Sequence, residues 1–155
     1  MFREMRRKQC EGSFQEAELM LKKAPHGTLG VVGDEGYPYT VPVSFVYKDG
    51  KILFHCATEG HKLDAIVNNE KVSFCVIEQD EIIPEDFNTL YRSTIVFGRA
   101  KIIKDDKSIQ EALELILEKY SPKHIDSGKK YIKAEWASLK VVEIQIDHMT
   151  SKIGD

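Results

Sequence analysis

Apolar and polar positions alternate most regularly between residues 37 and 47. Every second residue there is apolar: Tyr37, Tyr39, Val41, Val43, Phe45 and Tyr47. This period of two predicts a half-buried β-strand. Pro38 and Pro42 lie within it. Because proline has no N–H to donate to a neighbouring strand, part of this strand must lie at a sheet edge or at a bulge.

Shorter patterns predict the other strands and the loops. Apolar or alternating runs predict strands over residues 28–32, 51–56, 72–76, 91–104 and 142–146. Asp49-Gly50 predicts a tight hairpin between two of them. Residues 78–88 are acidic and contain Pro84, so we expect a loop there, and we expect residues 148–155 to form a polar tail.

Helical spacing of apolar residues predicts the helices. Residues 13–16 and 108–111 both carry the Ser-x-x-Glu pattern of a capping box, which predicts that helices begin at Ser13 and Ser108. Pro25 and Pro122 end these two helices. A short helix is expected from Gly60 to residues 68–69, and a polar one over residues 126–137.

The order of these elements indicates the fold class. A helix, three strands, a helix, two strands, two helices and a final strand predict a mainly β fold with α (α+β), built on an antiparallel sheet. Closure of the sheet into a small barrel would remove most exposed edges. With 155 residues and no linker-like segment, we expect one domain over residues 1–155, including a basic N-terminal arm over residues 1–10.

Composition and charge narrow the function classes. The chain is 42% hydrophobic and 30% charged, which is typical of a globular protein, and its net charge of −3 argues against nucleic acid as a partner. It has neither a run long enough to span a membrane nor a signal peptide, so we expect a cytoplasmic protein. Cys10, Cys56 and Cys75 have no metal-binding spacing, and we interpret them as buried reduced thiols, with no metal site.

Residues 58–62, Thr-Glu-Gly-His-Lys, form a candidate anion site between a strand and a helix. If the helix begins near Gly60, its first N–H groups lack partners inside the helix, and its dipole adds partial positive charge. Lys62, and in one interpretation His61, adds a side-chain donor. Together these features favour a bound phosphate. The alternative is a solvated first turn whose charges bind nothing.

Two further features carry alternatives. His55 points away from Phe54 and Cys56 in strand geometry, and it is interpreted either as a satisfied core histidine or as a functional residue. The basic residues of the N-terminal arm form either a solvated tail or an arm that folds over an anionic site. They are Arg3, Arg6, Arg7 and Lys8.

Several motifs, in order, resemble the nitroimidazole-resistance family. They are the MRRK start, GYPYTVPVSFVY (36–47), DGKILFHCATEGHKLDAI (49–66), KVSFCVIEQDEIIPEDFNTLYRSTIVFGRA (71–100), KYSP (119–122) and DHMTSK (147–152). That family belongs to the FMN-binding split-barrel superfamily, which also contains the pyridoxamine 5′-phosphate oxidases. The resemblance implies a split β-barrel homodimer with FMN at the subunit interface.

The resemblance also implies roles for individual residues. It places the FMN phosphate at Gly60, His61 and Lys62. It also places the preceding strand, with His55, Ala57 and Thr58, beside the flavin. The strand around Val41, Pro42, Val43 and Ser44 would present its backbone to the ring. Arg92, Ser93 and Thr94 would reach the flavin from the partner subunit. His55 would lie near the ring as a candidate catalytic residue.

The resemblance implies an FMN-dependent oxidoreductase. A reduced nicotinamide or a similar donor would supply electrons that pass to a small electrophile, for example a nitroaromatic. The alternative is a flavin- or haem-binding protein that sequesters its ligand without rapid turnover, with His55 as an axial ligand. Two departures limit the transfer: Ser151 stands where relatives often have glycine, and the chain lacks the C-terminal extension that binds substrate in true pyridoxamine phosphate oxidases. Oxidation of that vitamer is therefore not expected.

Overall fold

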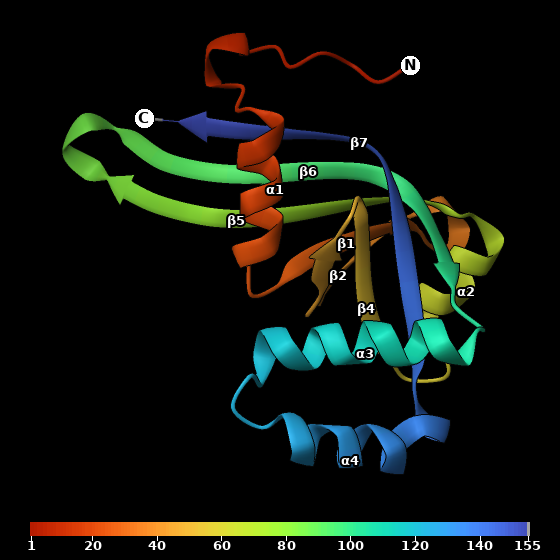
Figure 1. Cartoon of the computed structure of the whole chain (residues 1–155). Helices are drawn as coiled ribbons and strands as arrows, with labels where there is room; N and C mark the ends of the chain where they lie inside the picture. The colour runs from red at the N-terminus through yellow and green to blue at the C-terminus, as the bar shows by residue number, and fades with distance from the viewer. Residues whose placement is uncertain (155) are drawn as a thin grey trace.

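The computed structural model describes residues 1–154 and places seven strands in one antiparallel sheet. The sheet order is β2-β1-β5-β6-β7-β4-β3. The strands are β1 (Gly27–Val32), β2 (Pro38–Val43), β3 (Val46–Lys48), β4 (Lys51–Cys56), β5 (Lys71–Ile83), β6 (Asn88–Ile102) and β7 (Lys140–Gly154). The α-helices are α1 (Phe14–Lys23), α2 (His61–Asn68), α3 (Asp106–Tyr120) and α4 (Ile125–Glu135). In Figure 1, α1 crosses the β5–β6–β7 part of the sheet, and α3 and α4 lie together below it.

The sheet curves back on itself, as a split barrel does. Its two edge strands, β2 and β3, are consecutive in the chain and are joined only by Ser44 and Phe45. The predicted α+β antiparallel split-barrel class is therefore confirmed, and so is the placement of Pro38 and Pro42 in an edge strand.

The prediction of one uninterrupted strand over residues 37–47 is wrong, because Ser44 and Phe45 lie outside any strand and separate β2 from β3. Helix α3 supplies the physical reason. The Phe45 N–H donates to the Tyr120 hydroxyl at 2.9 Å, and the Phe45 carbonyl accepts from Lys119 Nζ at 2.9 Å. These bonds replace a strand partner for the Phe45 backbone.

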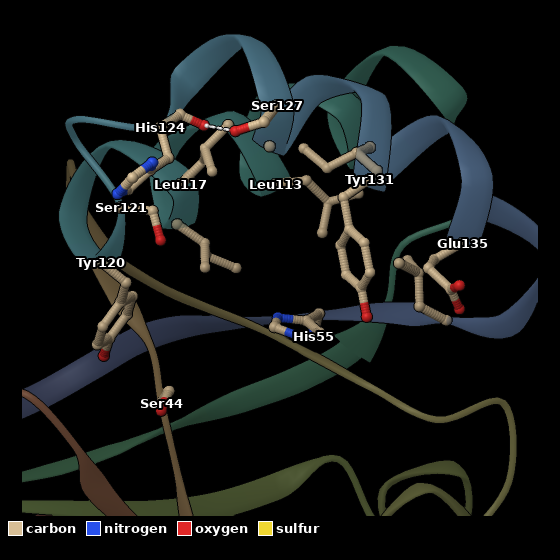
Figure 2. A pocket seen from close by; sticks show the side chains of 14 residues that line it. Ser44, His55, Leu113, Leu117, Tyr120, Ser121, His124, Ser127, Tyr131 and Glu135 are labelled. Carbon is tan, nitrogen blue, oxygen red and sulfur yellow. Dashed lines mark hydrogen bonds between the residues drawn. The ribbon is translucent and has the colours of Figure 1, made fainter.

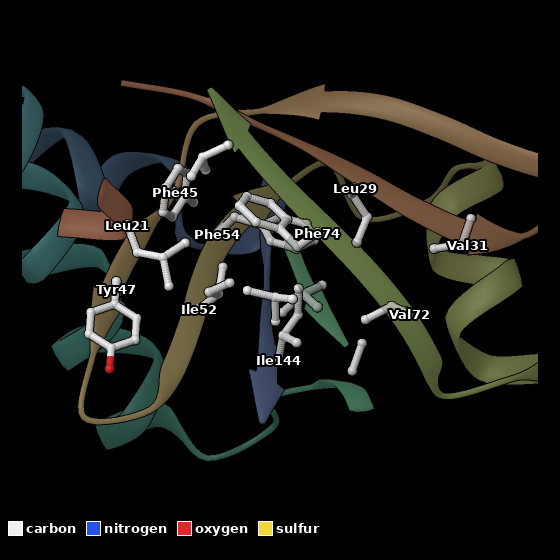
Figure 3. Packing of buried hydrophobic residues seen from close by; sticks show 14 of the residues in the cluster. Leu21, Leu29, Val31, Phe45, Tyr47, Ile52, Phe54, Val72, Phe74 and Ile144 are labelled. Carbon is white, nitrogen blue, oxygen red and sulfur yellow. The ribbon is translucent and has the colours of Figure 1, made fainter. Parts of the chain in front are cut away.

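Two apolar clusters lie on opposite sides of β4. The larger one fills the barrel beneath α1 and α2, and its centre contains Phe45, Phe54 and Phe74 (Figure 3). The Phe45 and Phe74 rings meet edge to face, with centroids 4.8 Å apart. The smaller cluster joins Leu53 and Val141 to α3 and α4. Strand β4 thus contributes Phe54 to one core and Leu53 to the other, as the predicted alternation requires.

The prediction of a loop over residues 78–88 is wrong, because β5 and β6 pair as one long hairpin as far as Ile83 and Asn88. Only Pro84–Asp86 form a turn. A β-bulge lies between Ile77 and Gln79, and Arg92 Nε donates to the Glu78 carboxylate at 2.8 Å. Most side chains of this hairpin tip are exposed on both faces, so the apolar period that signals a strand is missing there.

The prediction of a polar tail over residues 148–155 is also wrong for residues 148–154, which the structure describes. Strand β7 continues to Gly154 and pairs with β6 up to Tyr91. The position of Asp155 lies outside the described residues. Backbone pairing with β6, rather than apolar periodicity, holds this segment in the sheet.

The two predicted capping boxes have different outcomes. The first is confirmed, since Ser13 Oγ accepts from the Glu16 N–H at 3.1 Å and the Glu16 carboxylate accepts from the Ser13 N–H at 2.7 Å. The second is wrong, because the N-cap of α3 is Asp105, whose carboxylate accepts from the Ser108 N–H at 2.9 Å. Asp105 offers the same local acceptor three residues earlier, so helix α3 begins one turn sooner.

The cysteines are free thiols, as interpreted, but only Cys10 is fully buried. Cys56 and Cys75 are half-buried, so the interpretation of these two as buried thiols is wrong in degree. Burial nevertheless raises the pKa of both thiols above the usual value for cysteine.

Candidate functional site

The turn between β4 and α2 has the geometry of an anion site. Gly60 is the N-cap of α2 with φ 151° and ψ 168°, a conformation that is essentially restricted to glycine. No side chain caps this end of the helix, and the Gly60 carbonyl accepts from the N–H groups of Leu63 and Asp64. The N–H groups of His61 and Lys62 therefore lie at the open positive end of the helix dipole.

The His61 side chain is engaged elsewhere. Its Nε2 accepts from the Asp34 N–H at 3.2 Å, and its ring lies against Tyr39 with centroids 4.2 Å apart. Gly33 permits this approach, because a Cβ at that position would lie 3.0 Å from His61 Nε2. His61 thus ties α2 to the turn between β1 and β2, and its backbone N–H remains directed to the helix end.

Lys62 is the free cation of this turn. Its ammonium group makes no ion pair with any of the residues 1–154. It lies close enough to Cys56, the last residue of β4, to offset part of the rise that burial causes in the pKa of that thiol. Ala57 and Thr58 are exposed and connect this strand end to Gly60. The structure therefore gathers the predicted residues from His55 to Lys62 along one strand–turn–helix segment.

His55 faces a cavity rather than a core. The cavity, about 670 Å³ in volume, lies between β4, the bend at Ser44 and the helices α3 and α4 (Figure 2). Its wall is apolar along Leu113 and Leu117 of α3, and Tyr131 of α4 reaches into it (Figure 2). The interpretation of His55 as a satisfied core histidine is wrong, because its imidazole is exposed and has no hydrogen-bond partner among the described residues.

The electrostatic state of His55 follows from its position. The protein atoms of the cavity wall displace part of the water around the exposed His55 ring, and this lowers the pKa of His55 below its usual value because a charged ring would lose hydration there. The imidazole is therefore neutral at neutral pH, with both a donor and an acceptor nitrogen available to a ligand.

The segment from Val41 to Ser44 reaches this cavity only at its last residue. Val41 and Val43 are half-buried and pack against the larger core, whereas Pro42 and Ser44 are exposed. Of these four residues, Ser44 lines the cavity opposite His55. Because β2 is an edge strand, one side of its backbone is free for a ligand.

Lys119 and Tyr120 hold the bend at Phe45 in place, a role that the sequence pattern did not reveal. Lys119 Nζ donates to the carbonyls of Ala24 and Phe45 at 2.6 and 2.9 Å, and it lies 4.0 Å from the centroid of the Phe45 ring. The Tyr120 hydroxyl donates to the Pro25 carbonyl at 2.6 Å. Burial lowers the pKa of Lys119 to about 8. The available signal was the KYSP motif, whose first two residues make these contacts.

Strand geometry separates Arg92, Ser93 and Thr94. Thr94 is fully buried and its hydroxyl donates to Met20 Sδ at 3.2 Å, whereas Arg92 pairs with Glu78. Ser93 points to the opposite face of β6.

This stretch also lies far from the α2 turn within one chain. Ala100, which donates to the Glu70 carbonyl just after α2, is six residues from Thr94 along β6, or about 20 Å at the rise of a strand. Figure 1 shows α2 beside the other end of β6. One chain therefore does not bring Arg92–Thr94 and Lys62 into a common site.

Comparisons with known proteins agree with this architecture. The family described as Pyridoxamine 5′-phosphate oxidase matches residues 13–153. No curated protein matches the chain. In the part of the chain that the structure describes, no helix is both long and apolar enough to cross a membrane.

Solved structures with low sequence identity share the fold. A proposed 5-nitroimidazole antibiotic resistance protein from Bacteroides thetaiotaomicron superposes with a TM-score of 0.74 and 22% identity, covering 91% of this chain and 84% of that one. A flavocytochrome from Azotobacter vinelandii gives a TM-score of 0.85 and 18% identity over 98% and 72% of the two chains. An FAD- and heme-binding protein from Mycobacterium smegmatis gives 0.78 and 20% over 92% and 72%.

Proposed function

Because the chain belongs to the pyridoxamine 5′-phosphate oxidase family, we propose that it binds FMN and acts as an FMN-dependent oxidoreductase. Electrons from a reduced nicotinamide or a similar donor would pass to a small electrophile, and a nitroaromatic is the acceptor we would test first. The descriptions of several proteins with the same fold support flavin as the ligand, including the FAD- and heme-binding protein from M. smegmatis. The same fold in a proposed nitroimidazole-resistance protein supports the choice of acceptor.

The observation that carries the proposal is the segment from His55 to Lys62, which has an anion-binding end and a ring-sized end. At one end, Lys62 is unpaired and the N–H groups of α2 are open. Gly60 has free space around it, since a Cβ there would meet nothing within 4 Å. At the other end, His55 and Ser44 face an apolar cavity of about 670 Å³. These donors fit a phosphate, and such a cavity fits a planar ring.

The residues would divide the work of binding and proton transfer. Bound flavin supplies the redox chemistry, and the protein supplies position and electrostatics. Lys62 would hold the phosphate as a point charge, supported by the backbone N–H groups of His61 and Lys62. Ala57 and Thr58 would line the path between the two ends, and the backbone of Val41–Ser44 would lie along the ring. His55, neutral at neutral pH, would orient a substrate or donate a proton to it.

The proposed assembly is a homodimer with FMN at the interface. The face of β5 and β6 opposite α1 exposes Ile77, Ile95 and Phe97, which are 62%, 44% and 39% exposed. Ser93 lies on the same face of β6. Covering this face with a second copy would bury these apolar side chains and bring Ser93 toward the flavin of the partner.

The test is the absorption spectrum of the purified protein, followed by anaerobic mixing with NADH and with NADPH. We expect the two absorption bands of a bound flavin at their usual wavelengths. One of the two nucleotides should bleach these bands by reducing the flavin. Release of the flavin and its identification by chromatography distinguishes FMN from FAD. A protein that takes up neither flavin when both are supplied in excess would contradict the proposal.

The unpartnered imidazole of His55 favours a second candidate, a flavin- or haem-binding protein that does not turn over rapidly. A neutral imidazole with a free nitrogen is the common axial ligand of haem iron. A Soret band in place of the flavin bands, lost in His55→Ala, would support haem. Flavin bands without bleaching by any nicotinamide would support sequestration.

A further inference from the structure

A small cavity beneath the N-terminal arm is lined by positive charge. It has a volume of about 240 Å³ and lies between residues 3–7 and strands β6 and β7. Its polar lining consists of Arg3, Arg6, Arg7, Ser93, Thr150 and Lys152. No carboxylate of the described chain lines it. In Figure 1 the arm passes beyond β7 on the side away from α3 and α4.

The arm is anchored on both sides of these arginines, although the arginines themselves are exposed. The Phe2 ring stacks on Phe97 and His148, with centroids 5.4 and 4.7 Å away. At the other end Cys10 is buried, and the Gly12 N–H donates to the Ser151 carbonyl at 3.0 Å. The arginines lie on the stretch between these anchors, which holds them over β6 and β7.

These cations lack the partners that would neutralise them. The guanidinium groups of Arg3, Arg6 and Arg7 make no ion pair or hydrogen bond with any side chain of residues 1–154. Lys8, by contrast, pairs with Glu4 at 2.7 Å on the outside of the arm. Grouping like charges in this way is unfavourable unless an anion joins them.

We propose that this cavity binds a phosphoryl group. Guanidinium groups match phosphate oxygens with paired hydrogen bonds, and the hydroxyls of Ser93 and Thr150 offer two further donors. The volume is below the roughly 300–1,000 Å³ of pockets that enclose a whole small-molecule ligand, so the cavity takes the phosphate end of a ligand and leaves the rest outside. It is distinct from the turn at Lys62, which lies near the opposite end of β6.

Two ligands of the proposed function carry this chemistry. One is the FMN phosphate of a partner copy, because Ser93 is on the face proposed for the dimer. The other is the phosphate of a reduced nicotinamide nucleotide. The choice between these sources rests on the proposed function, whereas binding of a simple phosphate does not.

The test is calorimetric titration of the full-length protein with pyrophosphate at low salt. It uses wild type, the double variant Arg6→Gln/Arg7→Gln and the control Lys8→Gln, each with and without Lys62→Ala, because the Lys62 turn is itself a proposed phosphate site. We expect the double variant to bind pyrophosphate at least about tenfold more weakly, because two charge-assisted contacts are lost. The control, which alters the ion-paired cation of the same arm, should stay within about twofold of wild type. Absence of pyrophosphate binding by the wild type, or equal losses in the double variant and the control, would overturn the proposal.

Two further measurements keep the result interpretable. If circular dichroism shows that the double variant is unfolded, Arg6→Lys/Arg7→Lys replaces it, and its pyrophosphate affinity should still fall because lysine lacks the paired geometry; unchanged affinity would overturn the proposal. Comparing FMN with riboflavin, and NADPH with NADH, identifies the source. If the double variant binds FMN more weakly but binds riboflavin as wild type does, the cavity holds the flavin phosphate. If its KM for the nicotinamide nucleotide rises while its FMN affinity is unchanged, the cavity holds the phosphate of the electron donor. If the protein binds pyrophosphate but no flavin, the phosphoryl site proposed here would stand and the proposed function would be wrong.

Discussion

The β4–α2 turn and the Arg92–Thr94 stretch are both expected to contact one cofactor, yet the fold treats them differently. In the turn, neighbouring residues cooperate: Gly60 opens the helix end, His61 secures it to the β1–β2 turn, and Lys62 remains free. In the stretch, the pleat sends Ser93 to one face and Arg92 and Thr94 to the other. A turn concentrates consecutive side chains, whereas a strand divides them.

This difference indicates what each region contributes. The turn is complete within one chain and offers side-chain charge as well as backbone donors. The stretch can offer one side chain, Ser93, to a ligand on the exposed face, and its other two side chains have structural partners. We therefore expect substitutions in the turn to have large effects on ligand affinity, and those in the stretch to differ by face.

The largest effect is expected from Lys62→Ala. Removing a charge-assisted contact with the phosphate should weaken FMN binding by about 1.5–3 kcal/mol, or roughly 10- to 150-fold. Riboflavin, which lacks the phosphate, should bind with unchanged affinity. Fluorescence titration of the apoprotein measures both. Lys23→Ala, at an exposed position of helix α1, is the control. Equal FMN affinity in Lys62→Ala and wild type would remove Lys62 from the site.

Gly60→Ala tests the backbone of the same turn. The new methyl group has free space, so the cost comes only from φ 151°, which a residue with a Cβ rarely adopts. We expect a loss of about 1–3 kcal/mol in the free energy of unfolding, together with weaker FMN binding. Urea denaturation measures the first effect. Val67→Ala, exposed on the same helix, should change stability by well under 1 kcal/mol, and a similar result for both variants would mean that the turn tolerates other conformations.

Local sequence predicts those parts of the molecule in which neighbouring residues determine the structure. The Asp49-Gly50 hairpin adopts φ 49° and 76°, as its dipeptide indicates, and the Ser13–Glu16 capping box forms both of its bonds. Pro38 and Pro42 limited their strand to a sheet edge or a bulge, because proline has no N–H to donate to a neighbouring strand, and the structure places the strand at an edge. The same reasoning placed an open helix end at Gly60.

The missed features depend on residues that are distant in sequence. Tyr120 holds the bend at Phe45 across 75 residues, and no periodicity in either segment reports that contact. The end of β7 is a strand because β6 pairs with it, not because its own side chains alternate. The hairpin tip around Glu78 and Arg92 is exposed on both faces, so the burial that produces a pattern is absent. The arginine-lined cavity likewise requires that Phe2 and Cys10 fix the arm.

A pair of variants on β6 tests the effect of the pleat. Ser93→Ala should weaken FMN binding by about 0.5–1.5 kcal/mol, the usual value of one hydrogen bond, if the partner copy presents its flavin to this face. Thr94→Val removes a buried hydroxyl that donates to Met20 Sδ, so FMN affinity should not change. Both affinities come from titration of the apoprotein. The reverse order of effects would show that the buried face of β6 contacts the ligand.

The smallest effect concerns the protonation of His55. Because burial lowers its pKa, the native state binds fewer protons than the unfolded chain at pH values just below 6.5. The associated stability is complete above about pH 6.5 and is lost as the pH falls through the lower native pKa. NMR titration should give His55 a midpoint below the usual value for histidine. The difference in unfolding free energy between wild type and His55→Gln should decrease over the same pH range. A His55 midpoint at or above the usual value for histidine would mean that the cavity wall does not desolvate the ring, and the neutral imidazole assigned to the ring end of the site would no longer follow from its position.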